Sequence, residues 1–141
     1  MGPQGRRQHL TFRLPGATLE RLDARAHQIG ESRTGLAERY LEEGLRMDEH
    51  PGIGFADGPS GRRAVLIGTG LDVWEVVATV RQSRGSVASA ARYLELGPSQ
   101  VRSAVRYYAA FPTEVDDMLT RQADAAAREE EAAVRERAAL G

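Results

Sequence analysis

The sequence lacks cysteine and lysine altogether and contains only three histidines. Without cysteine, the chain can form neither a disulfide framework nor a thiolate metal site. The histidines, His9, His27 and His50, are scattered along the chain, so we do not expect an imidazole cluster. The sequence therefore predicts neither a metal ion nor another cofactor.

Long apolar runs are absent as well. No segment approaches the roughly 20 apolar residues of a membrane-spanning helix. The first residues are not followed by an apolar run of signal-peptide length. We therefore expect a soluble, cytoplasmic protein with no membrane partner.

Signatures of catalysis are also lacking. We find no paired carboxylates suited to a cleft, no nucleophile with a nearby base and no metal-ligand spacing. The glycine-rich string of residues 52–58 has neither the preceding buried strand nor the Lys-Ser/Thr ending of a phosphate-binding loop. The sequence thus predicts a protein that is not an enzyme.

The charged residues are unevenly distributed. All 19 basic residues are arginine. Residues 1–50 hold 8 arginines and 8 acids, residues 51–111 hold 7 and 4, and residues 112–141 hold 4 and 8. The three net charges are therefore 0, +3 and −4. Because the first three arginines precede any acid, a basic arm leads the chain and an acidic segment follows at the other end.

The first fifty residues are predicted to form one strand and two helices. Residues 9–14 alternate polar and apolar side chains, which is the pattern of a half-buried strand. Apolar residues at three- and four-residue steps predict an amphipathic helix over residues 17–29, ended by Gly30. Ser32 is placed to cap a second helix that runs to about residue 46.

The middle of the chain is predicted to form a hairpin followed by three helices. Two short strands, residues 53–56 and 64–67, lie in glycine- and proline-rich sequence, although a linker would have the same composition. The helices are expected over residues 72–82, 86–95 and 99–110. Trp74 is interpreted as a core anchor. After Pro112 the sequence is rich in Ala, Glu and Arg, which predicts a frayed helix or a disordered tail.

The single N-terminal strand needs a partner, because the elements that follow it are helices and cannot satisfy its backbone hydrogen bonds. The simplest partner is the same strand of a second copy. Antiparallel pairing buries three apolar side chains against four helices, namely Leu10, Phe12 and Leu14. The outer face of the ribbon then carries His9, Thr11 and Arg13. A two-stranded ribbon of this width fits the major groove of double-stranded DNA.

This segment resembles the ribbon-helix-helix family of Arc, MetJ and CopG. The resemblance covers residues 8–48 and is carried by the order Leu-Thr-Phe-Arg-Leu, helix, Gly-Glu-Ser-Arg-Thr, helix, which is close to the CopG type. It implies a dimer, or a higher even oligomer, on operator DNA. It also implies that the outward strand residues read base edges, which here are His9, Thr11 and Arg13.

Phosphate contacts follow from the same resemblance. In this family, backbone N–H groups at the start of the second helix clamp DNA phosphates, a role that falls here on Ser32, Arg33 and Thr34. The attraction of anions to a helix N-terminus agrees with this assignment. Arg6 and Arg7 would add unspecific attraction to phosphate.

Residues 53–117 are similar to a second, antitoxin-associated family that joins a short hairpin to a three-helix unit like a helix-turn-helix. The similarity is carried by residues 61–65, 68–74, 86–87 and 98–108, closed by Pro112. Members usually have an arginine where this chain has Gly70. They commonly occur beside genes for PIN-like ribonuclease toxins, so the two resemblances together imply an antitoxin of the VapB kind.

The helix expected over residues 99–110 has a polar face. Its inward side chains would be Val101, Ala104, Val105 and Tyr108. Its outward side chains would be Gln100, Arg102, Ser103 and Arg106. A second DNA-reading helix or a partner-binding surface has this arrangement, and so has any solvated helix.

The acidic segment after Pro112 has the composition of a helix that folds on a partner, or of a solvated helical extension. PIN-like nucleases hold a metal ion with clustered carboxylates. An inserted antitoxin arginine could displace that metal through charge-assisted hydrogen bonds. Four arginines are candidates for this contact: Arg121, Arg128, Arg135 and Arg137.

Together these patterns predict a mostly helical chain with short β-structure and three domains. Residues 1–49 would dimerise and bind DNA, residues 50–111 would form the hairpin and three helices, and residues 112–141 would form a helical tail. The function predicted is an antitoxin that represses its own operon and neutralises a PIN-like ribonuclease. The alternative is a stand-alone ribbon-helix-helix regulator whose second domain senses a signal or oligomerises.

Overall fold

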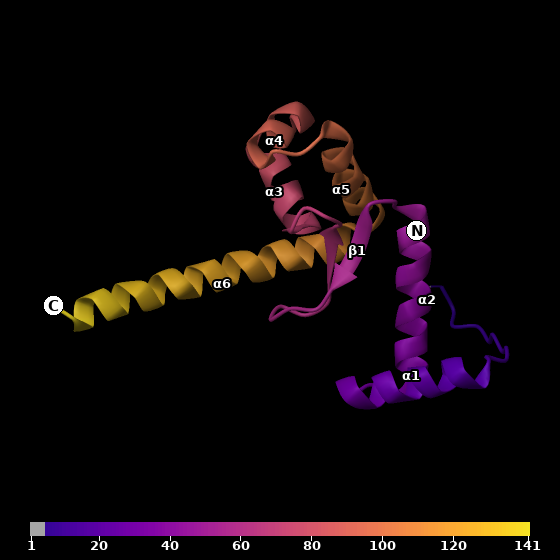
Figure 1. Ribbon diagram of the computed structural model, residues 1–141. Coiled ribbons are helices and arrows are strands. Elements are labelled where there is room, and N and C mark those ends of the chain that lie inside the picture. Colours follow the sequence, from indigo (N-terminus) through magenta and orange to yellow (C-terminus); the bar gives the residue numbers. More distant parts are fainter. Residues whose placement is uncertain (1–4) are drawn as a thin grey trace. The chain divides into compact units, whose positions relative to one another are not determined.

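The computed structural model describes residues 5–141 and is mostly helical (Figure 1). Six helices and three short strands form within these residues. They belong to two compact units, of which the first ends at Glu42 and the second begins at Glu43. The prediction of a mostly helical chain with short β-structure is confirmed, while the predicted boundaries after residues 49 and 111 stay predictions.

The first unit holds α1 (Gly16–Ile29) and the greater part of α2 (Arg33–Glu49). Helix α1 ends at Ile29, as predicted, and α2 begins directly after the predicted cap Ser32. Gly30 adopts a left-handed backbone with φ of 70° and closes the last turn of α1. Ser32 Oγ accepts a hydrogen bond from the N–H of Gly35 at 2.9 Å, so Ser32 caps α2.

Residues 5–15 have no regular secondary structure in the single chain, so the strand predicted over residues 9–14 is not formed there. A strand requires a hydrogen-bonded neighbour. The one sheet among residues 5–141 consists of other segments. The three apolar side chains of residues 9–14 are consequently exposed, at 75% for Leu10, 57% for Phe12 and 39% for Leu14.

The second unit contains the sheet and the remaining helices. Its elements are β1 (Ile53–Ala56), β2 (Arg63–Leu66), β3 (Leu71–Asp72), α3 (Val73–Gln82), α4 (Val87–Leu94), α5 (Pro98–Ala110) and α6 (Pro112–Ala139). The sheet is antiparallel in the order β1-β2-β3, with Ile53 opposite Leu66 and Leu66 opposite Leu71. The predicted hairpin is confirmed. Strand β3 was not predicted, because two residues are too few to show an alternating pattern.

The core of the second unit lies between the sheet and the helices. Helix α3 packs against α4, α5, α6 and β2. Val76, Val101 and Ala104 are fully buried there. Trp74 packs against this core as predicted, and its indole N–H donates a hydrogen bond to Asp72 Oδ2 at 2.9 Å.

One core prediction needs correction. On α5, Tyr107 is completely buried, whereas Tyr108 and Val105, predicted to be buried, are only partly covered. The buried face is therefore turned toward Tyr107. A tyrosine can occupy such a position because its hydroxyl group finds hydrogen-bond partners there, Arg46 and Glu114.

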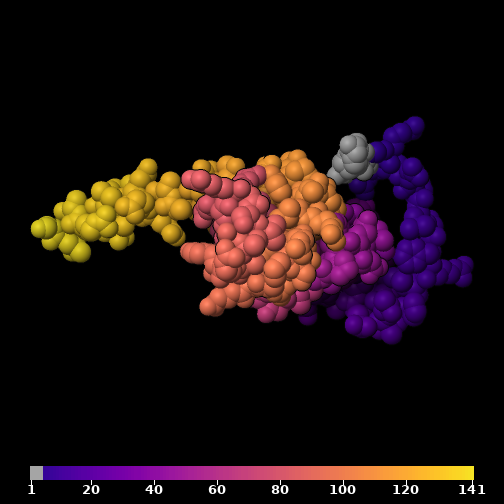
Figure 2. Space-filling model, turned by 90° about the horizontal axis from the view of Figure 1, so that it is seen from above, coloured from indigo at the N-terminus to yellow at the C-terminus, as the bar shows by residue number. Residues whose placement is uncertain are grey.

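Helix α6 continues without interruption from Pro112 to Ala139, so this segment is helical rather than disordered. Val115 and Met118 in its first turns are buried in the core of the second unit. Gln122 Nε2 donates a hydrogen bond to Ser60 Oγ at 2.9 Å. Beyond that point the helix leaves the core, as its yellow end shows in Figure 2.

Candidate nucleic-acid interface

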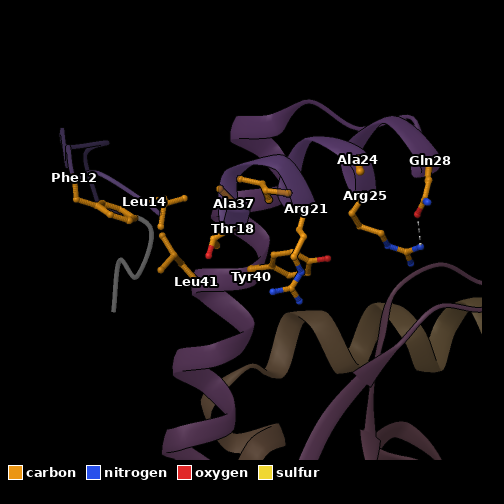
Figure 3. A pocket seen from close by; sticks show the side chains of 11 residues that line it. Phe12, Leu14, Thr18, Arg21, Ala24, Arg25, Gln28, Ala37, Tyr40 and Leu41 are labelled. Carbon is orange, nitrogen blue, oxygen red and sulfur yellow. Dashed lines mark hydrogen bonds between the residues drawn. The ribbon is translucent and has the colours of Figure 1, made fainter. Parts of the chain in front are cut away.

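Two open hollows lie along the exposed apolar residues of the first unit. The first has a volume of about 610 Å³, and Figure 3 shows Phe12, Leu14 and Leu41 at one end of it and Tyr40 further along. The second, of about 630 Å³, shares Phe12, Leu14 and Leu41 and reaches Leu10. Tyr40 and Leu41 are themselves about half exposed, at 46% and 49%. The first unit therefore presents a wide apolar surface to solvent.

The three predicted base-reading residues lie on the irregular segment beside this surface. His9, Thr11 and Arg13 are all exposed. Their side chains make no hydrogen bond or ion pair with any residue from 5 to 141. All three are thus accessible to a ligand, although the single chain does not arrange them in the row that a strand would give.

The start of α2 leaves backbone donors unpaired. Ser32, Arg33 and Thr34 are exposed, and the first bond of the helix runs from the N–H of Leu36 to the carbonyl of Ser32. Because Ser32 Oγ already takes the N–H of Gly35, the N–H groups of Arg33 and Thr34 have no acceptor within the described chain. These amides can bind an anion such as a phosphate.

The Arg33 side chain has a different role from its backbone. Its Nε and Nη2 donate to the two carboxylate oxygens of Asp23 on α1, at 2.6 and 2.8 Å. These hydrogen bonds lower the pKa of Asp23 below its usual value. The bidentate pair ties the start of α2 to α1 and so orients the free amides.

The arginines of the leading arm differ in their surroundings. Arg7 pairs with Glu38 on α2, although both side chains are largely exposed. Such a surface pair contributes little and weakens in salt. Arg6 is exposed and has no partner among residues 5–141. Arg6 is therefore the freer of the two for phosphate attraction.

The four polar residues predicted for α5 are not equivalent. Gln100 Oε1 accepts a hydrogen bond from the N–H of Gly97 at 2.9 Å, and Ser103 Oγ donates to the carbonyl of Ser99 at 3.0 Å. Both side chains thus serve the helix itself. Arg102 and Arg106 are exposed and make no hydrogen bond or ion pair within the described chain.

The four candidate arginines of α6 also differ in their contacts. Arg121 donates to the carbonyl of Ser60 at 3.0 Å and therefore holds the helix on the second unit. Arg137 lies 3.7 Å from a Glu130 carboxylate oxygen. Arg128 and Arg135 are exposed and have no partner among the described residues.

One polar network was not anticipated from the sequence. Arg46 Nη1 donates to the Tyr107 hydroxyl at 2.8 Å and to Glu114 Oε1 at 2.7 Å. The Arg46 guanidinium also stacks on the Phe111 ring, 3.8 Å from its centroid. Burial, with the Glu114 hydrogen bond, raises the pKa of Tyr107. No local motif indicates this network, because Arg46 lies 61 residues before Tyr107 in the sequence.

Two negative findings apply to residues 5–141. No group of three or more potential metal ligands comes together there. No helix in this part of the chain combines the length and apolar composition that a membrane crossing requires.

Comparisons with known proteins give no relative: no protein-family model matches the chain, and neither the curated proteins nor the solved structures provide a match. The resemblances described from the sequence therefore rest on the residues quoted for them.

Proposed function

We propose that this chain is an antitoxin-type autorepressor, which binds its own operator DNA as a homodimer and neutralises a PIN-like ribonuclease toxin. In this proposal residues 8–48 form a ribbon-helix-helix module together with a second copy. The observation that carries it is the exposure of Leu10, Phe12 and Leu14 beside an open apolar hollow, on a segment with no strand partner in residues 5–141.

A second copy would supply both a strand partner and a cover for the exposed apolar side chains of this segment. Its own residues 9–14 would supply the missing backbone hydrogen bonds. Its side chains would cover the apolar surface, and burying one large apolar side chain stabilises by about 1.5–3 kcal/mol. Within the described chain, residues 5–15 form no strand pairing with another segment, so their backbone hydrogen bonds are not supplied there.

The polar groups of the same unit suit a DNA duplex. If the apolar side chains of the ribbon turn inward, the alternation of a strand turns His9, Thr11 and Arg13 outward. The unpaired N–H groups of Arg33 and Thr34 would then meet a phosphate at the flank of the groove. Base contacts would give sequence preference and phosphate contacts would give register.

The toxin-binding part of the proposal rests on the resemblance of residues 53–117 to an antitoxin-associated family. The exposed end of α6 supports it, since this acidic helix carries Arg128 and Arg135, which have no partner among residues 5–141. An arginine on a helix of this kind can reach clustered carboxylates through charge-assisted hydrogen bonds.

The test combines footprinting with a growth assay. The purified full chain should protect a site in the DNA upstream of its own reading frame, and co-expression should rescue cells from the nuclease encoded beside it. Protection without rescue would leave the stand-alone regulator, the alternative function. Absence of protection on the upstream DNA would contradict autorepression.

A further inference from the structure

Helices α4 and α5 are joined by a turn of the kind found in helix-turn-helix units. Helix α4 ends at Leu94 and α5 begins at Pro98, so Glu95, Leu96 and Gly97 form the turn. Glu95 has a left-handed backbone with φ of 58°, and the N–H of Leu96 bonds to the carbonyl of Ala91 at 2.9 Å. A three- to four-residue turn containing glycine is typical of that motif.

The inward faces of both helices are packed with small or medium side chains. Ala90 and Ala91 of α4 are buried, and so are Val101 and Ala104 of α5. Because these residues fix the two helices against the core, the opposite face of α5 is open to solvent. Figure 2 shows the salmon and orange atoms of α4 and α5 at the surface of the second unit.

This outer face is positively charged. Helix α5 contains two arginines and no acidic residue, in a chain whose net charge is −1. Arg102 and Arg106 lie one helical turn apart, are exposed, and are not neutralised by any described residue. An unpaired arginine pair at this spacing can contact phosphates and the base edges between them.

The remaining side chains of the face discriminate between two kinds of partner. Protein interfaces have an apolar core, whereas DNA interfaces are polar and positively charged. Among the exposed large apolar residues of the structure, only Tyr93 belongs to α4 or α5. Gln100 has its carbonyl oxygen bonded to Gly97, which leaves its NH₂ group to donate. The composition favours DNA.

We propose that the outer face of α5, centred on Arg102 and Arg106, is a second DNA-binding surface of this chain that enters the major groove of a B-form duplex. The surface lies in the second unit and does not depend on the ribbon proposed for residues 9–14. An A-form RNA duplex is not its ligand, because its major groove is too deep and narrow for a helix.

The test measures binding of the full chain to a 30-base-pair duplex of mixed sequence, by fluorescence anisotropy between 50 and 200 mM salt. The variant R102Q/R106Q should bind roughly 10- to 100-fold more weakly at 0.1 M salt, and its salt slope should fall by about 2 per chain. The control R128Q/R135Q removes the same charge from an exposed helix and should bind like the parent. Unchanged thermal midpoints establish that both variants are folded.

Separate arms distinguish this surface from the ribbon. If only T11A/R13A weakens binding, the α5 proposal is wrong and the ribbon stands. If only R102Q/R106Q weakens binding, the α5 proposal stands and DNA binding by the ribbon is wrong. Equal loss in R128Q/R135Q, failure of the parent to bind the duplex at 50 mM salt, or preference for an RNA duplex of the same sequence would each overturn the assignment to α5.

Discussion

Arg46, in the last turns of α2, donates a hydrogen bond of 2.8 Å to the hydroxyl group of Tyr107, which is completely buried on α5. The same hydroxyl donates to Glu114 on α6. Residues of three helices therefore meet at one tyrosine oxygen within the second unit, to which the last turns of α2 belong. The hydroxyl therefore accepts one hydrogen bond and donates another, each with a charged partner. These two bonds offset the cost of burying it.

Replacing Tyr107 by Phe should destabilise the second unit by about 1–2 kcal/mol. The ring remains in the core, but Arg46 and Glu114 each lose a buried hydrogen-bond partner. Chemical denaturation followed by circular dichroism measures the loss. The control Tyr93→Phe removes a hydroxyl from a side chain that is 78% exposed and should change stability by less than about 0.5 kcal/mol. Equal stability of the two variants would contradict the network.

Much of the fold was predictable because its signals are local. Gly30 and Ser32 mark the end of α1 and the start of α2 through chemistry that acts within a few residues. Pro98 begins α5 in the same way, since its missing N–H is not needed there. Where a cap or a turn decides the structure, the neighbouring sequence suffices.

The features that could not be predicted depend on distant residues. Arg46 and Glu114 both form hydrogen bonds with Tyr107, although they are far apart in the chain. No periodicity in the sequence indicates which of the two adjacent tyrosines, Tyr107 or Tyr108, is buried. The site shows the same limit. The position of Arg33 at a helix start was predictable, but the engagement of its side chain by Asp23 depends on how α1 and α2 pack.

The ribbon can be tested through Phe12. Phe12→Asp would place a charge in the shared core of the proposed dimer, where its desolvation costs several kcal/mol. Sedimentation should show a dimer for the parent and a monomer for the variant. The variant should also have reduced helicity in residues 16–42, because these helices lose their partner. Leu140→Asp adds the same charge at a side chain that is 89% exposed and should leave the dimer intact. A dimeric Phe12→Asp variant, or a monomeric parent, would rule out pairing through residues 9–14.

Base reading is tested at Thr11 and Arg13. Arg13→Ala and Thr11→Ala should keep the fold, because both side chains are exposed and unbonded within the described chain. They should lose discrimination between the operator and unrelated DNA, and a lost bidentate arginine–guanine contact costs about 1–3 kcal/mol per half-site. Footprints are compared with those of Gln8→Ala, a neighbour outside the predicted reading set. Variants that protect the operator like the parent would show that another surface reads it.

The Asp23–Arg33 pair predicts a dependence on pH. Hydrogen bonds from Arg33 lower the pKa of Asp23 below its usual value in the folded chain. A group with a depressed folded pKa stabilises fully above its unfolded pKa, and that contribution is lost as the pH falls through the folded value. NMR titration should place the Asp23 pKa below the usual value of an aspartate in the parent, and closer to that value in Arg33→Gln. Arg21→Gln, also on the first unit, should leave the Asp23 pKa low. An Asp23 pKa that does not respond to Arg33→Gln would contradict the pair in solution.

The exposed end of α6 is the last element to test, and the structure decides where it can be cut. Met118 is buried, and Arg121 and Gln122 are bonded to Ser60, so a truncation before these residues would damage the core. A chain ending at Ala125 keeps them and removes Arg128, Arg135 and Arg137.

This truncated chain should bind duplex DNA and unfold like the parent, because it retains the first unit and the buried core of the second. It should no longer rescue growth in cells that express the neighbouring nuclease. The full-length variant R128Q/R135Q separates shape from charge. If it also fails to rescue, the arginines themselves contact the toxin, as expected for charge-assisted bonds to metal-binding carboxylates. If it rescues while the truncated chain fails, the helix binds but the arginine mechanism is wrong. Full rescue by the truncated chain would move the toxin-binding surface into the part of the chain before Ala126, and the acidic helix would then be a solvated extension.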